Sequence, residues 1–315
     1  MNTIAPPPPP AGPPAGPPPS GPPSAGPPMG TPPVTLDISG TPRVPFGRLI
    51  LVEWRKLVDT RAGLVLLSIT AGLVALIFGL VLLIVALSSG DSPTAADWLL
   101  ILTIPVSMLV PVLAITIVTQ EWSQRTAMVT FSLEPSRTRV VLAKLVAVMA
   151  LGVATILFAL ALGSFGNVLG AAMSGTDAVW NVSATTLFWT MAGQVLYLLM
   201  GFGLGLLLLN SPAAVAIYYV YVWILEGSSI ILPGVLYILW FATDWGQSIL
   251  PWISMRISML PFQISDSDRA SIESDLNSPL DTGALGIARI IVSVFIWVGI
   301  PLILGFSRLL RAEVK

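Results

Sequence analysis

Long apolar stretches without a single charged residue constrain this chain more than any other feature of its sequence. The first runs from Leu64 to Leu87, and similar stretches follow at residues 98–119, 145–170 and 186–209. An α-helix needs about 20 apolar residues to cross the hydrocarbon core of a bilayer, where backbone polar groups must bond within the helix. Each stretch is long enough. The sequence therefore predicts an all-α polytopic membrane protein.

Two further apolar stretches bring the prediction to six transmembrane helices. They run from Pro212 to about Leu225 and from Gly286 to Phe306, with Arg289 in the first turn of the second. A charge at mid-bilayer costs roughly 2.5–3.5 kcal/mol, which places Arg289 near a membrane surface. Charged residues make up only 10% of the chain, against about 25% in soluble domains, so most of the surface is expected to face lipid.

The distribution of basic residues predicts the orientation of the spans. Twelve of the 15 Lys and Arg residues precede the first span, lie between the second and third, or follow the last. By the positive-inside rule that side is cytoplasmic, together with both termini. Residues 233–285 are then extracellular, and their apolar first half predicts a re-entrant or interfacial hairpin before the last helix. A seventh span there would move Arg308 and Arg311 to the outside.

The first 63 residues divide into two parts. Residues 1–45 hold 18 of the 28 prolines, a composition that favours polyproline II and cannot build a core, so we predict a disordered cytoplasmic tail. Residues 46–63 have the pattern of a basic amphipathic helix at the membrane interface, with Trp54, Arg55 and Lys56 at the lipid surface. The same segment serves equally well as a simple topology anchor.

The loop at 120–144 is too polar to cross a membrane and too long for a tight hairpin. Trp122, Thr126, Val129 and Leu133 recur at helical spacing, which predicts a short helix that ends before Pro135. A mixed-charge helix of this kind suits the docking of a soluble protein. The residues alone also fit a solvated connector.

Three segments together resemble one family. VEWRKLVDTRA before the first span resembles the pre-membrane helix of bacterial ABC-2 type transporter permeases. The loop EWSQRT followed by LEPSRTRVVLAK is similar to the family's loop after the second span. GFGLGLLLLNSPAAVAI, residues 201–217, is similar to its turn between the fourth and fifth spans, although no basic residue precedes Asn210. The matching positions of the loop are Glu121, Arg125, Thr126, Pro135, Arg137, Arg139, Ala143 and Lys144.

The resemblance implies the membrane-spanning subunit of an ATP-driven exporter in a bacterial plasma (inner) membrane. Residues 64–315 would form the permease domain, as a homodimer or heterodimer seated on cytoplasmic ABC ATPase subunits. The helix that begins at Glu121 would be the coupling helix, with Trp122, Arg125 and Thr126 as further ATPase contacts. The alternative is a membrane anchor or adaptor that recruits a cytoplasmic protein without transport.

Composition excludes several other classes of function. The chain has no Cys and no His, which removes thiol chemistry and the commonest metal ligand, so neither a metal nor another cofactor is predicted. A net charge of −1 argues against nucleic acid. No lysine stands in a G-x-x-x-x-G-K-[ST] motif, so the chain is not expected to be an enzyme and must borrow its ATPase. Polar candidates for contact with a substrate are Asn167, Gln194 and Glu226.

Overall fold

The computed structural model describes most of the chain after the proline-rich tail, and every regular element in that part is a helix. The prediction of a disordered tail falls almost wholly on residues 1–43, which lie outside the described residues. The described residues are 44–88, 92–124, 136–225, 244–264, 269–270, 273–274 and 280–311.

Five helices are long and apolar enough to cross a membrane, as expected for the predicted all-α membrane protein. Four of them are continuous α-helices that match the first four predicted spans. The last is continuous in space but changes from α to π and back. The helices are α2 (Arg61–Leu87), α3 (Ala95–Ser123), α5 (Arg137–Ser174), α6 (Ala184–Leu208) and the series α12 (Ala284–Val294), η2 (Phe295–Gly299) and α13 (Ile300–Arg311).

The predicted fifth span is shorter in the structure. It consists of α7 (Ser211–Val220) and the π-helix η1 (Tyr221–Leu225), which at 1.5 Å per residue cover roughly 20 Å. The segment runs antiparallel to α3: the hydroxyls of Ser211 and Thr119 share a hydrogen bond, and Tyr219 Oη donates to the Met108 carbonyl at 3.1 Å. The chain after Leu225 lies outside the described residues, so the count of six spans is not decided by the structure.

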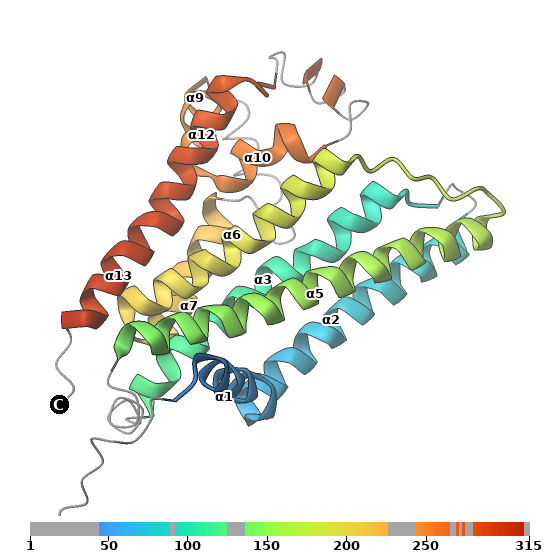
Figure 1. Ribbon diagram of the computed structural model, residues 1–315. Coiled ribbons are helices and arrows are strands. Elements are labelled where there is room, and N and C mark those ends of the chain that lie inside the picture. The colour runs from blue at the N-terminus through green and yellow to red at the C-terminus, as the bar shows by residue number, and fades with distance from the viewer. Residues whose placement is uncertain are drawn as a thin grey trace, which may run out of the picture. The chain divides into compact units, whose positions relative to one another are not determined.

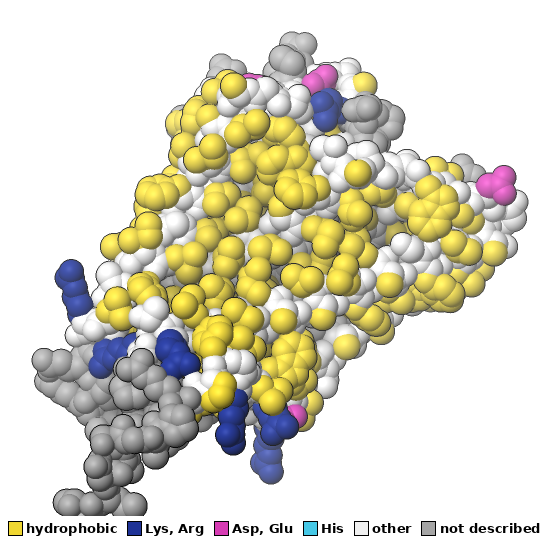
Figure 2. All heavy atoms as spheres, in the orientation of Figure 1, with side chains coloured by type: hydrophobic (Ala, Val, Ile, Leu, Met, Phe, Trp, Pro, Cys, Tyr) yellow, Lys and Arg dark blue, Asp and Glu magenta, His cyan; other side chains and the backbone are white. Residues whose placement is uncertain are grey.

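Helices α3 and α6 form the centre of the bundle, and α2, α5 and the α12–α13 series surround them (Figure 1). Most of α3 and α6 is buried, whereas the outer helices expose long rows of Leu, Ile, Val and Phe side chains. Apolar side chains accordingly cover the middle of the face shown in Figure 2. Exposed apolar rows on the outside of a bundle are what lipid contact requires.

Two glycines allow neighbouring helices of the bundle to approach closely. A Cβ on Gly201 of α6 would lie 2.5 Å from the Pro111 carbonyl oxygen of α3, so only glycine fits where these backbones meet. A Cβ on Gly166 of α5 would lie 2.9 Å from the ring of Trp98. Trp98 is fully buried and packs against Phe78 with ring centroids 5.3 Å apart. Both glycines therefore serve the packing of helices within one chain.

Helix α1 (Phe46–Asp59) precedes the first long helix, as the sequence predicts, but buries a different face. Phe46, at the start of the helix, has an exposed side chain. The buried row is Leu49, Glu53 and Leu57, at i, i+4 and i+8. This row packs on α5, α2 and α3. The buried face of α1 thus carries an acidic residue, and that residue needs partners.

The two ends of the bundle differ in charge. Helix α1, the start of α5 and the end of α13 meet at one end, which carries most of the described Lys and Arg (Figures 1 and 2). We call it the basic end. Two short helices, α9 (Asp244–Ile253) and α10 (Met255–Gln263), lie at the other end against α12 and α6. They occupy part of the segment for which a hairpin was predicted.

Candidate functional site

Four charged side chains form a closed ring of ion pairs at the basic end. Glu53 and Lys56 come from α1, Glu121 from the last turn of α3, and Lys144 from the second turn of α5. Lys144 Nζ lies 2.8 Å from Glu53 Oε2 and 2.9 Å from Glu121 Oε1. Lys56 Nζ lies 2.7 Å from an oxygen of each carboxylate. We call these four residues the charge ring.

The charge ring is buried and neutral overall. The side chains of Glu53, Glu121 and Lys144 are at most 6% exposed, and Lys56 is 29% exposed. Lys144 Nζ also donates to the Ile117 carbonyl at 3.2 Å, so all three of its protons have acceptors. A buried ion needs this degree of pairing, because its loss of hydration is otherwise not offset.

Lys56 connects the charge ring to solvent. Burial lowers the pKa of its ammonium, but the carboxylates of Glu53 and Glu121 outweigh that effect and raise the pKa above its usual value of 10.5. Lys56 is therefore fully charged at physiological pH. The ring joins three helices whose paired residues lie up to 91 positions apart in the sequence.

The structure gives Glu121 a role that the sequence did not suggest. We expected its carboxylate to face an ATPase, but the carboxylate is buried and held by Lys56 and Lys144. Glu121 and Trp122 stand on α3 itself, which continues to Ser123, so the predicted separate helix does not begin at Glu121. Trp122 is half-buried against the main apolar core, which residues of α3, α5 and α6 form for the most part. The other two predicted contacts, Arg125 and Thr126, lie outside the described residues, so contact with a partner stays a prediction.

Two arginines fix the chain where α5 begins. Arg137 Nη1 donates to the Leu309 carbonyl near the end of α13 at 2.7 Å. Arg139 Nη2 donates to the Val44 carbonyl, just before α1, at 2.7 Å. Both flanks of the connection at residues 125–135 are thus bonded to other elements: Glu121 on one side, and Arg137 and Arg139 on the other.

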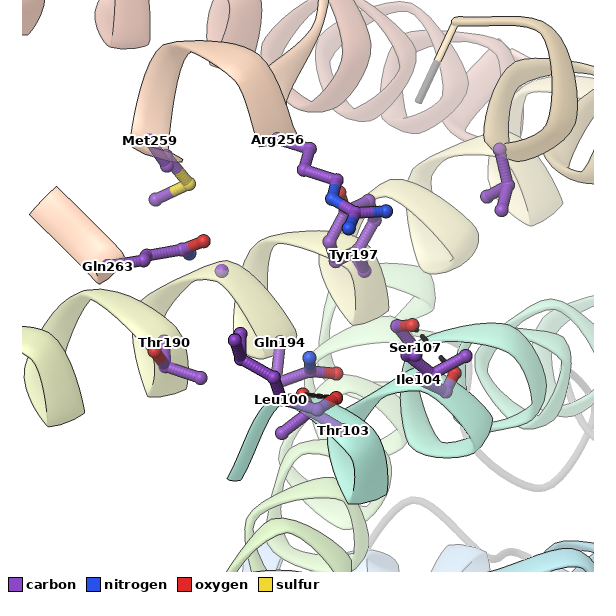
Figure 3. Close-up of a pocket in the computed structure, with 12 residues that line it drawn as sticks. Leu100, Thr103, Ile104, Ser107, Thr190, Gln194, Tyr197, Arg256, Met259 and Gln263 are labelled. Carbon is purple, nitrogen blue, oxygen red and sulfur yellow. Dashed lines mark hydrogen bonds between the residues drawn. The ribbon is translucent and has the colours of Figure 1, made fainter. Parts of the chain in front are cut away.

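A second candidate site lies in the other half of the bundle, where α3, α6 and α10 meet (Figure 3). It is a cavity of about 140 Å³, which we call the polar pocket. Each helix contributes residues three or four positions apart, so one face of each helix lines the cavity. The lining residues are Leu100, Thr103, Ile104, Ser107, Thr190, Gly193, Gln194, Tyr197, Val222, Arg256, Met259 and Gln263.

The hydroxyls that line the polar pocket are not equally satisfied. Thr103 and Ser107 donate to carbonyls of their own helix at 2.8–3.0 Å, as hydroxyls in apolar helices commonly do. Thr190 is 5% exposed, and its Oγ1 has no hydrogen-bond partner. A buried polar group without a partner costs about 1–3 kcal/mol. Such a group favours a bound ligand or water at this position.

The predicted substrate contacts separate into three cases. Gln194 lines the polar pocket. Asn167 does not: it is fully buried on α5, and its Nδ2 donates to the Val179 carbonyl at 3.1 Å, which fixes the connection before α6. Glu226 lies outside the described residues. Of the predicted interfacial residues, Trp54 packs against the main core, Arg55 is exposed, and Lys56 belongs to the charge ring.

Sequence reasoning missed Glu53 and the pocket residues Thr190 and Tyr197, although signals for them were present. Glu53 stands between Leu49 and Leu57 on one helical face, and an acid in an apolar row needs a buried cation. Thr190, Gln194 and Tyr197 are spaced i, i+4 and i+7 along an apolar span, which marks a polar stripe.

Neither metal chemistry nor similarity to other proteins defines these sites further. Among the described residues, no group of three or more Asp and Glu side chains is placed to hold a metal ion. No protein-family model matches this sequence, and no curated protein sequence matches it.

Proposed function

We propose that this chain is the membrane-spanning permease subunit of an ABC-2 type ATP-driven transporter, most simply an exporter, with six spans and cytoplasmic termini. The observation that carries the proposal is the charge ring. It joins Glu53 and Lys56 of the first segment that resembles the family to Glu121 and Lys144 of the second. Two segments recognised separately in the sequence thus form one mechanical unit.

The geometry suits the transmission of force from a cytoplasmic partner. Residues 125–135 lie between the end of α3 at Ser123 and the start of α5 at Arg137. Glu121 and Arg137 hold the two flanks to α1 and α13. A push on this connection would therefore move α1, α3, α5 and α13 together. In the proposed mechanism ATP-driven closure of two ATPase subunits supplies that push and alternates access to the pathway between the two sides.

The first experiment is purification of the tagged full chain from its native membrane in mild detergent. We expect co-purification of a protein that contains a G-x-x-x-x-G-K-[ST] motif, and ATP hydrolysis by the complex. Release of this ATPase by the variant Arg125→Glu would support the docking assignment. Glu121 is unsuitable for this test, because its substitution breaks the charge ring and the loss of a partner would then have two explanations.

A matched control is a charge reversal at the opposite end of the bundle. Asp177 is exposed in the connection between α5 and α6, and Asp177→Arg should leave the ATPase bound. A purified chain that brings no ATPase, or a complex without ATP hydrolysis, would contradict the permease proposal and favour the membrane adaptor. A docking variant that keeps its ATPase would contradict only the docking residues.

The proposed orientation can be tested because the chain has no cysteine. A single cysteine in place of exposed Asp177 should react with an impermeant maleimide added to intact cells. A single cysteine in place of exposed Arg55 should react only after the cells are permeabilised. The opposite pattern would invert the proposed topology.

A further inference from the structure

The polar pocket differs in chemistry from two larger cavities in the described part of the bundle. Cavities of about 240 and 290 Å³ lie between α3, α5 and the α5–α6 connection and between α2, α3 and α5. Their described linings are mostly aliphatic and aromatic and carry no formal charge. The described lining of the polar pocket has hydroxyls, amides and one formal charge, that of Arg256. The contrast separates a site built for a polar group from grooves that suit lipid tails.

We propose that the polar pocket binds the anionic head group, phosphate or carboxylate, of an amphiphile whose tail lies along the apolar surface of the bundle. Arg256 is the charged partner, and Thr190 and Gln194 are hydrogen-bonding partners. The site requires neither an ATPase nor transport, so it goes beyond the proposed function and does not depend on it.

The size of the pocket fits a head group and not a whole amphiphile. Its volume of about 140 Å³ is close to that of an engineered protein cavity of about 150 Å³ that holds one benzene molecule. A phosphate or carboxylate with its nearest carbons occupies a space of that order. Any longer chain must leave the pocket.

Charge and hydrogen bonding select an anion. Arg256 stands at the start of α10, and Figure 3 shows its guanidinium extending toward Tyr197 of α6, above Gln194. Arg is the side chain that matches carboxylate and phosphate oxygens best, because its donors are planar and paired. Thr190 Oγ1 is buried without a partner one helical turn from Gln194. An anion held by Arg256 would offer the acceptor that this hydroxyl lacks.

The apolar surface around the pocket offers contacts for the tail of the proposed amphiphile. Leu100 lines the pocket and is 45% exposed, so the cavity opens onto the apolar exterior of α3. Val220 and Trp223, on either side of the pocket residue Val222, are also exposed. Thr103 and Gln194 lie roughly 12 and 15 Å along helices that begin at the end opposite the charge ring. The head group would therefore sit among the helices, with lipid-facing side chains beside it.

The test uses the full chain in a neutral maltoside detergent, with dodecyl phosphate as the probe. Binding is measured as the rise of the apparent Tm with probe concentration, since a ligand of the native state stabilises that state. Dodecanol supplies the tail without the charge, and inorganic phosphate supplies the charge without the tail. We expect dodecyl phosphate to bind, and both controls to bind at least about tenfold more weakly, since a charged hydrogen bond of this kind is worth that factor or more.

Variants assign the binding to the pocket. Arg256→Gln should weaken dodecyl phosphate binding about tenfold or more, and Arg256→Lys should restore most of it. Thr190→Val should weaken binding severalfold without lowering the Tm of the free protein, because it removes an unpartnered hydroxyl and keeps the shape. Gly193→Val fills the space facing Gln263 and Met259, 3.1 and 3.7 Å from the Cβ position, and should abolish binding. The matched control is Arg289→Gln, which removes a positive charge of α12 outside the pocket lining.

Several results would overturn the proposal. Wild-type affinity in both Arg256→Gln and Gly193→Val would show that dodecyl phosphate binds elsewhere. If dodecanol binds as tightly as dodecyl phosphate, the pocket does not select an anion. If inorganic phosphate binds as tightly as dodecyl phosphate, the alkyl tail contributes nothing and the ligand is not an amphiphile. If Arg256→Gln does not fold, Gly193→Val and Thr190→Val decide the question, since neither changes a charge.

Discussion

Loss of Lys144 is the sharpest test of the charge ring. In Lys144→Met the carboxylates of Glu53 and Glu121, 1% and 6% exposed, keep only Lys56 between them. One buried negative charge then has no counter-ion. Removing one partner of a buried ion pair costs about 3–5 kcal/mol. At about 2–4 °C per kcal/mol, the apparent Tm should fall by roughly 6–20 °C.

The reciprocal variant separates charge balance from loss of packing. Glu53→Gln leaves two ammonium groups to share Glu121 and should cost a similar free energy of unfolding. The double variant keeps the neutral pair of Lys56 and Glu121, which are 2.7 Å apart. Its cost should therefore be smaller than the sum of the two single costs, by roughly 0.5–3 kcal/mol, as is usual for residues in one ion-pair network.

The assay is thermal unfolding of the full chain in neutral detergent, followed by tryptophan fluorescence, with size-exclusion chromatography to measure the folded fraction. Arg55→Met is the matched control, because Arg55 is exposed on the same helix and such a change should stay within about 0.5 kcal/mol. Single variants within about 1 kcal/mol of wild type, or costs that simply add, would refute the reasoning that the four residues act as a unit.

Three other predictions concern single features of the bundle. Because the pKa of Lys56 is raised in the folded state, its stabilising contribution is complete below pH 10.5 and is lost as the pH rises through the higher pKa of the folded state. At pH 11 Lys56→Arg should therefore melt at a higher temperature than wild type. An equal fall of the apparent Tm in both proteins would contradict this. Gly201→Ala forces apart α3 and α6, where the Cβ would lie 2.5 Å from a carbonyl oxygen, and should destabilise the chain by about 1–3 kcal/mol. Gly72→Ala, which has no atom within 4 Å of its Cβ position, is the control and should be neutral or slightly stabilising. Arg137→Gln loses the hydrogen bond from Arg137 to the Leu309 carbonyl, so the end of α13 should be cut faster by proteases. An unchanged rate of proteolysis would show that this hydrogen bond does not hold α13 in place.

The membrane-spanning helices could be predicted from the sequence because hydropathy and length depend on each segment alone. Five predicted spans correspond to helices of sufficient length. The fifth in chain order, beginning at Pro212, is shorter among the described residues because η1 ends at Leu225. Pro105 and Pro111 both lie inside α3, which runs from Ala95 to Ser123.

The two candidate sites could be predicted only in part, because each depends on which helix faces go together. A helical wheel of α1 shows which side of the helix is apolar, but it does not show which residues contact α5. Glu53 was therefore not assigned a role. Glu121 was identified as functional, yet its partners lie 23 and 65 residues away. Gln194 was identified as a polar contact, but no local pattern joins it to Arg256 across two helices and a segment outside the described residues.

The residues of the charge ring are synthesised in a fixed order. Glu53 and Lys56 leave the ribosome first, Glu121 follows with α3, and Lys144 comes only with the start of α5. Until then the charge ring consists of two carboxylates and one ammonium, so the buried charges between α1 and α3 are not balanced. Arrival of the third long helix supplies the missing cation and completes the set. The packing of α1 against α3 therefore gains its charge balance only when α5 is in place.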